Sequence, residues 1–361
     1  MSPTLPAPLS LPDVDSIAVG GDHACAISDD KLFCWGSNAQ LQFGTPDAGV
    51  GPHAMPIDAS PFWFQFAEEG DSATVLAGGA TTCLLVRINL IAGQAITCWG
   101  DNRKGQCGRN QTAQQLQSSI VVDGRPSPEP IDLPSVWGAS VGEGHVCAWH
   151  DVEGVVEATV VNQISCWGSN EFGQLGVSVD VTASSGSPLR VGGTGDGTSQ
   201  VVVGRDFSCM IPREDRSAVW CWGSNSFGQL GVADYALATN VPQSVAYDDV
   251  YRPCRSSVGG TLAPIGALCV TQISAGADHM CLLDYFGRVA CWGNTQWASS
   301  QSTKHVPRLV PLAGEAISIS SGDGFGCAVL QDGGTQCWGS NDQLQLGRMA
   351  GADVDYVEYF R

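Results

Sequence analysis

Cysteine and histidine, the side chains that most often bind zinc or move protons, recur in this chain inside two short signatures. The first signature is Gly-x-x-(His, Phe or Thr)-x-Cys and the second is Cys-Trp-Gly, and six copies of each alternate along the sequence. A zinc site needs closely spaced ligands such as Cys-x-x-Cys, whereas the two cysteines of each copy lie nine to nineteen positions apart. The spacing argues against zinc and favours covalent pairing of the cysteines.

Three histidines, His23, His145 and His279, share one position of the first signature. Equivalent positions of a repeat lie apart in the fold, so these imidazoles cannot converge on one substrate, and we expect them to anchor hairpins. The chain has no nucleophile elbow, metal-ligand pair or phosphate loop. The sequence therefore predicts no catalytic residue, no metal site and no cofactor. Other residue types fill the histidine position in the remaining copies: Thr81, Phe207 and Phe325.

Each copy of the two signatures belongs to a longer repeat. In five copies Cys-Trp-Gly continues into a tail that resembles Gly-Gln-Leu-Gly, whereas the fifth copy reads "CWGNTQWASS" from residue 291. A constant phrase with variable spacers is typical of a repeated supersecondary unit with insertions in its loops. We expect one domain over residues 1–361. Its inserted loops are expected at about 44–71, 109–135, 177–198 and 232–270.

The elements that position these cysteines are predicted to be β-hairpins. In "CAISDDKLFC" a two-residue turn at Asp29-Asp30 places Cys25 directly opposite Cys34. Opposed residues of an antiparallel pair lie within disulfide range. The same folding predicts five more bridges and allows a seventh: Cys83–Cys98, Cys147–Cys166, Cys209–Cys221, Cys281–Cys291 and Cys327–Cys337, with Cys254–Cys269 as the seventh.

Cys107 is left over from this pairing and is expected to be a small buried hydrophobic residue rather than a reactive thiol. Six or seven structural disulfides indicate an oxidising compartment, so an extracellular, cell-surface or periplasmic location is expected.

The tryptophan of each copy directly follows a paired cysteine and therefore points to the opposite face of its strand. We expect the six indoles to pack between neighbouring sheets rather than form a ligand-binding cage. They are Trp35, Trp99, Trp167, Trp222, Trp292 and Trp338.

Composition excludes several classes of partner. The 361 residues carry a formal net charge of −19, which disfavours nucleic acids and anionic lipid surfaces. No apolar run is long enough to span a membrane, and the proline-rich N-terminus lacks the positive charge of a signal peptide. Asn110, in "NQT", is a glycosylation acceptor if the source is eukaryotic and secretory.

The combined pattern, Gly-x-x-His-x-Cys followed by Cys-Trp-Gly-x-Asn-x-x-Gly-Gln-Leu-Gly, resembles the repeat of the regulator of chromosome condensation family. The resemblance covers roughly Ile17 to Gly347 and implies an all-β fold, a β-propeller of such repeats. Six repeats predict six blades, with seven as the alternative, and the two chain ends are expected to share one blade. The paired cysteines depart from nuclear members and resemble a disulfide-bearing extracellular branch.

The function expected from these features is non-enzymatic recognition of a protein or glycan, or a scaffold within a larger surface assembly. Alternatives are an inhibitor of a secreted enzyme and a propeller hydrolase or lyase. The disulfides and acidity disfavour nucleotide exchange on a small GTPase. Binding is expected through the loops between repeats, and the best contact candidates lie in "PFWFQF": Phe62, Trp63, Phe64 and Phe66.

Overall fold

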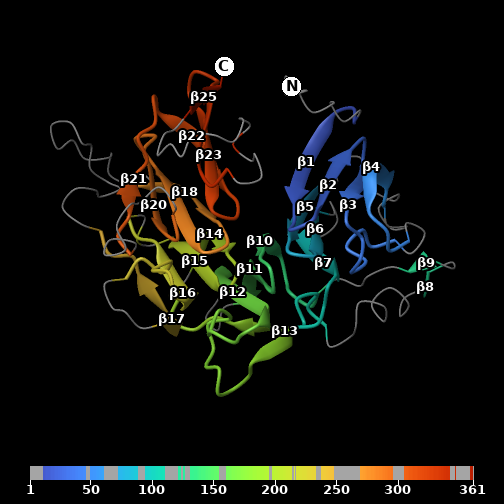
Figure 1. Ribbon diagram of the computed structural model, residues 1–361. Coiled ribbons are helices and arrows are strands. Elements are labelled where there is room, and N and C mark those ends of the chain that lie inside the picture. Colours follow the sequence, from blue (N-terminus) through green and yellow to red (C-terminus); the bar gives the residue numbers. More distant parts are fainter. Residues whose placement is uncertain are drawn as a thin grey trace. The chain divides into compact units, whose positions relative to one another are not determined.

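All regular secondary structure that the computed structural model describes is β-strand (Figure 1). Among these residues no helix is long and apolar enough to cross a membrane. The described residues are 11–45, 49–60, 72–87, 94–109, 121–122, 125–126, 131–153, 160–194, 197–213, 215, 217–232, 237–247, 269–295, 305–341, 346 and 358–360.

The chain divides into two compact units, each of which is described by itself. The first unit comprises Met1–Glu171 and Val177–Val191, and the second comprises Phe172–Gly176 and Gly192–Arg361. The short segment 172–176 is the tail of the third repeat, so this tail joins the sheets of the second unit rather than those of its own repeat. The expectation of one domain over the whole chain stays a prediction.

The first unit contains the sheets of three repeats. Its first sheet has the strand order β1-β2-β3-β4, and a second, seven-stranded sheet has the order β13-β12-β11-β10-β7-β6-β5. A single residue pair, Val136 with Gln94, joins β10 to β7, so the seven strands are the sheets of the second and third repeats linked at one point. A short pair, β8-β9, lies apart from both.

The strands of this unit are β1 (Val14–Val19), β2 (His23–Ser28), β3 (Lys31–Gly36), β4 (His53–Asp58), β5 (Ser72–Gly78), β6 (Thr81–Arg87), β7 (Gln94–Gly100), β8 (Val121–Val122), β9 (Arg125–Pro126), β10 (Val136–Val141), β11 (His145–Glu153), β12 (Val160–Ser169) and β13 (Ser184–Arg190).

The second unit contains three four-stranded sheets in sequential strand order, β14 to β17, β18 to β21 and β22 to β25. Its strands are β14 (Thr198–Val203), β15 (Phe207–Pro212), β16 (Trp220–Ser224), β17 (Ala238–Ser244), β18 (Val270–Ala275), β19 (His279–Asp284), β20 (Val289–Gly293), β21 (Arg308–Leu309), β22 (Ala316–Ser321), β23 (Phe325–Leu330), β24 (Thr335–Gly339) and β25 (Glu358–Phe360).

The central hairpin of every sheet forms as its sequence predicts. In the first repeat Ser28 pairs with Lys31 and Cys25 with Cys34, around a turn in which Asp29 and Asp30 both have positive φ. Each of the six cysteine pairs faces across its hairpin with Cα atoms 4.0–4.1 Å apart and is bonded. The expected all-β fold with one disulfide-linked hairpin per repeat is thereby confirmed.

Three of the expected inserted loops contain the outer strands of sheets. β4 lies within 44–71, β13 within 177–198 and β17 within 232–270. Their sequences, "HAMPID", "SSGSPLR" and "ATNVPQS", carry a proline each and lack strong alternation. Proline is tolerated because an outermost strand donates few hydrogen bonds to a sheet. For that reason the sequence predicts loops where β4, β13 and β17 form.

The core of each unit lies between neighbouring sheets. In the first unit one buried cluster contains residues of the β1–β4 and β5–β7 sheets, and another joins β5–β7 to β10–β12. In the second unit the corresponding clusters join β14–β17 to β18–β20, and β18–β20 to β22–β24. Apolar residues on alternate strand positions thus stack the sheets face to face.

The expectation that the chain ends share one blade is wrong for the described residues. The N-terminal strand β1 pairs with β2 in the first sheet, whereas the C-terminal β25 pairs with β24 in the last. Each end therefore pairs within the sheet of its own neighbouring repeat.

Candidate functional site

The repeated tryptophan links each repeat to the tail of the preceding one. The indole Nε1 of Trp292 donates to the backbone oxygen of Gln229, 2.9 Å away, in the tail of the fourth repeat. Trp292 is 1% exposed. The glutamine carbonyl is therefore a repeated acceptor for the next repeat's indole. The same bond from the indole Nε1 to a glutamine backbone oxygen joins three further pairs: Trp99 with Gln42, Trp167 with Gln106 and Trp222 with Gln174.

The asparagine and glutamine of the repeated phrase hold a tight turn at the end of the third strand, which we call the tip turn. In the fourth repeat Asn225 Oδ1 accepts from the backbone N–H of Leu230 at 3.1 Å. Gln229 Oε1 accepts from the N–H of Phe227 at 2.8 Å. Both amide side chains are buried. They replace the hydrogen bonds that a turn cannot make with a neighbouring strand, so the turn is fixed from within.

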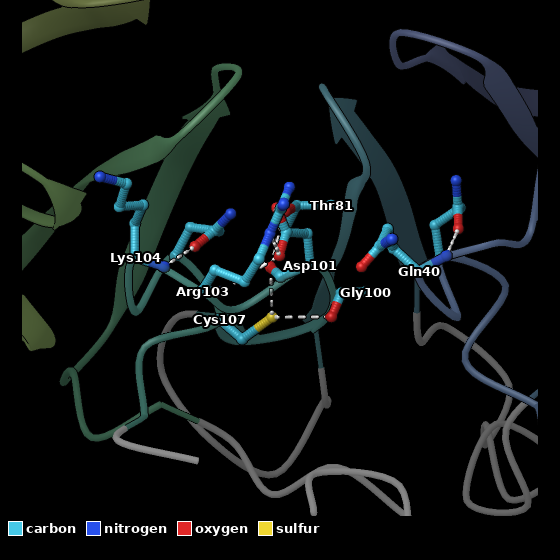
Figure 2. Close-up of polar contacts among 9 residues, drawn as sticks. Gln40, Thr81, Gly100, Asp101, Arg103, Lys104 and Cys107 are labelled. Carbon is cyan, nitrogen blue, oxygen red and sulfur yellow. Dashed lines mark hydrogen bonds and ion pairs between the residues drawn. The ribbon is translucent and has the colours of Figure 1, made fainter. Parts of the chain in front are cut away.

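The same bonds recur in other repeats. Asn38 and Asn102 accept from the backbone N–H groups of Phe43 and Cys107. Gln40, Lys104 and Phe172 donate their N–H groups to the glutamine two positions later. Figure 2 shows Lys104 and Gln40 at two such turns, each with a bond to a nearby amide.

Two glycines of the phrase are required by close approach. Gly223 has a φ of +104°, and a Cβ there would collide with the backbone oxygen of Asp206. Gly231 has a φ of +69° and lies against the indole of Trp292, with a built Cβ 2.8 Å from Nε1. Only glycine adopts this backbone conformation without strain and also leaves room for the neighbouring repeat.

Two residues follow the asparagine in each tip turn, and most of them are exposed. The first differs in every fully described turn, whereas the second is phenylalanine in the third and fourth repeats and differs in the first two. Phe172 and Phe227 are 37% and 40% exposed although both are large and apolar. A rigid turn whose buried residues are constant and whose exposed residues vary is suited to present a different contact at each repeat. In the other two fully described tip turns the pair is Ala39-Gln40 and Arg103-Lys104.

In the second repeat the tip turn carries cations held by acidic neighbours. Arg103 forms an ion pair with Asp101 at 2.8 Å, drawn in Figure 2. Burial raises the pKa of Asp101, but the hydrogen bonds and charge of Arg103 outweigh it and leave this pKa below its usual value. Lys104 pairs with Glu171, the exposed residue of the next tip turn. Because Glu171 belongs to the first unit, this ion pair lies within that unit.

The loops between the first and second strands lie at the same end of the sheets as the tip turns. Gln174 Nε2 donates to Asp206 Oδ1 at 3.3 Å, and the Ser224 N–H donates to the Asp206 backbone oxygen at 2.8 Å. In the second unit Arg205 pairs with Asp278 at 2.9 Å and with Asp323 at 3.7 Å. One guanidinium thus faces carboxylates from the two following repeats.

The signature histidines are buried inside the hairpins. His23 Nε2 is 2.8 Å from Thr82 Oγ1. A Cβ on Gly20 or Gly276 would collide with the ring three residues later, which explains the first glycine of the signature. Desolvation lowers the pKa of His23 and His279 to about 4, partly offset by Asp22 and Asp323 respectively. These rings are neutral at pH 7 and pack like the phenylalanines that replace them.

Cys107 is a buried free thiol in the tip turn of the second repeat. Its Sγ lies 3.4 Å from the backbone oxygen of Asp101 (Figure 2). Burial raises the pKa of this thiol well above its ordinary value. A protonated, water-excluded thiol is not a nucleophile. Within the described part of the chain no cluster of three histidine, cysteine or acidic residues could hold a metal ion.

Several predicted residues lie outside the described ones. Cys269 is disulfide-bonded, but its expected partner Cys254 is not described. The exposed tip-turn phenylalanines, Phe172 and Phe227, were not predicted as contact residues, because they lie inside a repeated phrase whose other residues are structural. An aromatic side chain at a position that varies among the repeats is visible in the sequence and could have marked these residues. The other undescribed candidates are Phe62, Trp63, Phe64, Phe66 and the sequon residue Asn110.

Comparison with known families identifies the repeat. The regulator of chromosome condensation (RCC1) repeat matches residues 14–42, 199–229 and 217–283. Human RCC2 is 25% identical over 265 residues, which are 70% of this chain and 47% of RCC2. A mouse RCC1-like G exchanging factor-like protein is 27% identical over 336 residues, covering 86% of this chain and 66% of that protein. The chain spans about half the length of the RCC2 relatives.

Solved structures show the same fold. The chain superposes on human WBSCR16 with a TM-score of 0.70 and 21% identity, covering 97% of this chain and 82% of that one. Yeast RCC1 (Prp20), in its complex with Kap60, gives a TM-score of 0.67 at 18% identity, covering 94% and 72% of the two chains. Repeats, relatives and fold agree, and the expected RCC-type β-propeller is confirmed.

Proposed function

We propose that this chain, a β-propeller of regulator of chromosome condensation repeats, is a non-enzymatic protein-recognition module of an oxidising compartment. The proposal rests on a contrast within the repeat between side chains that are buried and bonded and side chains that are exposed. The repeated Cys, Trp, Asn and Gln side chains bond within the fold, whereas the two tip-turn residues after the asparagine vary among the repeats and are mostly exposed. Rigid turns with variable exposed residues favour binding over chemistry.

Relatives and neighbours support protein partners in general terms. The yeast Prp20 structures report a complex with Kap60 and binding to Gsp1p and histones. Those partners belong to Prp20, whose likeness to this chain is one of fold. This chain has six described hairpin disulfides and a net charge of −19. Both favour a site outside the nucleus and an extracellular, surface or periplasmic setting.

The experiment that tests recognition presents the labelled, oxidised protein to an array of secreted proteins and an array of glycans. We expect saturable binding to one or a few proteins. Binding to glycans alone would overturn the protein-partner proposal. Turnover in a hydrolase panel without any binding would instead favour an enzyme.

The compartment is tested separately by mass spectrometry of the protein from its native source, alkylated without reductant. We expect the six hairpin bridges intact and Cys107, a free thiol, to be alkylated once the protein is denatured. Free thiols throughout would return the chain to a reducing compartment. They would also favour nucleotide exchange on a GTPase, the activity that the name of the mouse relative suggests.

A further inference from the structure

The second unit carries an apolar surface beside a row of carboxylates. Phe172 and Phe227 occupy the same position of successive tip turns, and Leu237, just before β17, is 73% exposed. The Asn225 N–H donates to the Leu237 backbone oxygen at 2.7 Å, so this leucine lies beside the tip turn of Phe227. We call Phe172, Phe227 and Leu237 the tip patch.

The tip turn of Phe172 lies against the same sheet as the tip turn of Phe227. A Cβ on Gly173 would be 2.9 Å from Asn240 Cβ of β17, and a Cβ on Gly223 of β16 would be 3.2 Å from Gln174 Cβ. Both phenylalanines are therefore presented at one end of the β14–β17 sheet, on turns that buried asparagine and glutamine side chains keep rigid.

The charges at this end of the unit are mostly negative. Asp206, Asp278 and Asp323 come from the first loops of three successive repeats, and Arg205 of the first of these loops pairs with Asp278 and Asp323. The Asp323 side chain is 79% exposed, and its contact with Arg205 is long at 3.7 Å. Asp323 thus keeps most of its capacity to pair with a cation from outside.

We propose that the tip patch and the adjoining carboxylates bind a basic peptide segment of a partner protein, a proposal that rests on the recognition function above. Apolar side chains of the segment would cover Phe172, Phe227 and Leu237, and a lysine or arginine would pair with Asp323. The argument for this occupant is charge complementarity. Exposed aromatic rings beside carboxylates suit a chain that combines apolar and cationic groups.

The test uses short fluorescein-labelled peptides and fluorescence anisotropy. One peptide alternates lysine with leucine or phenylalanine, a second alternates lysine with serine, and a third alternates glutamate with leucine. We expect the first to bind more tightly than the other two. Equal binding of the first and second peptides would show attraction to net charge alone and overturn the tip patch.

Variants locate the contact. F172S/F227S should weaken binding of the first peptide about tenfold, as loss of aromatic anchors does at interfaces. D323N should weaken it a few-fold and reduce its salt dependence. Tyr285 is a matched control, since it is 47% exposed but lies at the opposite turn of its hairpin. Y285S should leave the affinity unchanged, and an effect equal to that of F172S/F227S would refute the assignment.

These surface variants are checked for folding by thermal unfolding under oxidising conditions, where we expect unchanged midpoints. The array experiment separates the two proposals. A partner that binds F172S/F227S as well as the parent protein would leave recognition standing and overturn the tip patch. An absence of any partner would overturn recognition itself.

Discussion

The fourth and fifth repeats share the hairpin but differ in the tail. The fourth reads "CWGSNSFGQLG", and its tail receives the indole of Trp292 at the Gln229 carbonyl. The fifth reads "CWGNTQWASS", and the next indole, that of Trp338, makes no such bond to any described residue. The hairpin therefore stabilises one repeat from within, whereas the tail connects a repeat to its successor.

The largest effect is expected from the hairpins, in both repeats alike. C209A/C221A and C281A/C291A each open a loop of similar length, with separations of 12 and 10 residues. Each double variant should lose about 2–5 kcal/mol of unfolding free energy. Urea unfolding followed by tryptophan fluorescence measures this loss. A much smaller loss in the fifth repeat would show that hairpin and tail are not independent.

The next largest effect is expected where the tail meets the following indole. G231A places a Cβ against Trp292 at a φ of +69° and should destabilise by about 2–4 kcal/mol, as strain and overpacking add. G333A is the matched control, because its φ is +85° but no atom lies within 4 Å of the added Cβ. That variant should lose only about 1–2 kcal/mol. Equal losses would mean that backbone strain, and not contact with the neighbouring repeat, restricts Gly231.

A smaller difference isolates the hydrogen bond. W292F and W338F remove the same indole N–H, but W292F leaves the buried acceptor at Gln229 without its donor, whereas Trp338 donates to no residue that the structure describes. We expect W292F to lose about 1–2 kcal/mol more than W338F. The comparison is made by urea unfolding at neutral pH. If W338F is the more damaging variant, the tail is not the main connector between repeats.

The smallest effect depends on pH and again separates the two repeats. The fourth has Phe207 where the fifth has His279, whose folded pKa is about 4. Because this pKa lies below the ordinary value of 6.5, the unfolded chain binds more protons between pH 6.5 and 4, and stability is lost as the pH is lowered through that window. H279F should remove about 1 kcal/mol of the loss between pH 6.5 and 5.5.

Urea midpoints at the two pH values check this prediction, with the parent protein as reference. At pH 7 the variant should match the parent, because Phe207 already packs in the equivalent position with no exposed surface. An unchanged pH dependence would mean that His279 is protonated without opening the hairpin.

Much of the hairpin architecture is predictable from sequence. The turn at Asp29-Asp30 and the pairing of Cys25 with Cys34 follow from local turn chemistry and strand alternation. The buried tryptophans also follow from alternation. What the sequence does not reveal is their acceptor, because Gln229 lies 63 residues before Trp292 and offers its backbone rather than its side chain.

The outer strands and the site were harder to foresee. The sequence of β17 contains Pro242 and no strong alternation of apolar and polar residues, so it predicts a loop. The segment is a strand because it pairs with β16. The sequence pattern predicts only a structural role for the tip turns. Their exposed positions, such as Phe227, become visible as candidates only when buried and exposed residues of one phrase are told apart.

The division between buried residues that hold the fold and exposed tip-turn residues that contact a partner has one most direct test. It is the affinity of F172S/F227S for the protein partner found on the array, measured by surface plasmon resonance. We predict at least about tenfold weaker binding with an unfolding midpoint equal to that of the parent. Unchanged affinity, or a loss of affinity only in step with a lowered midpoint, would contradict that division.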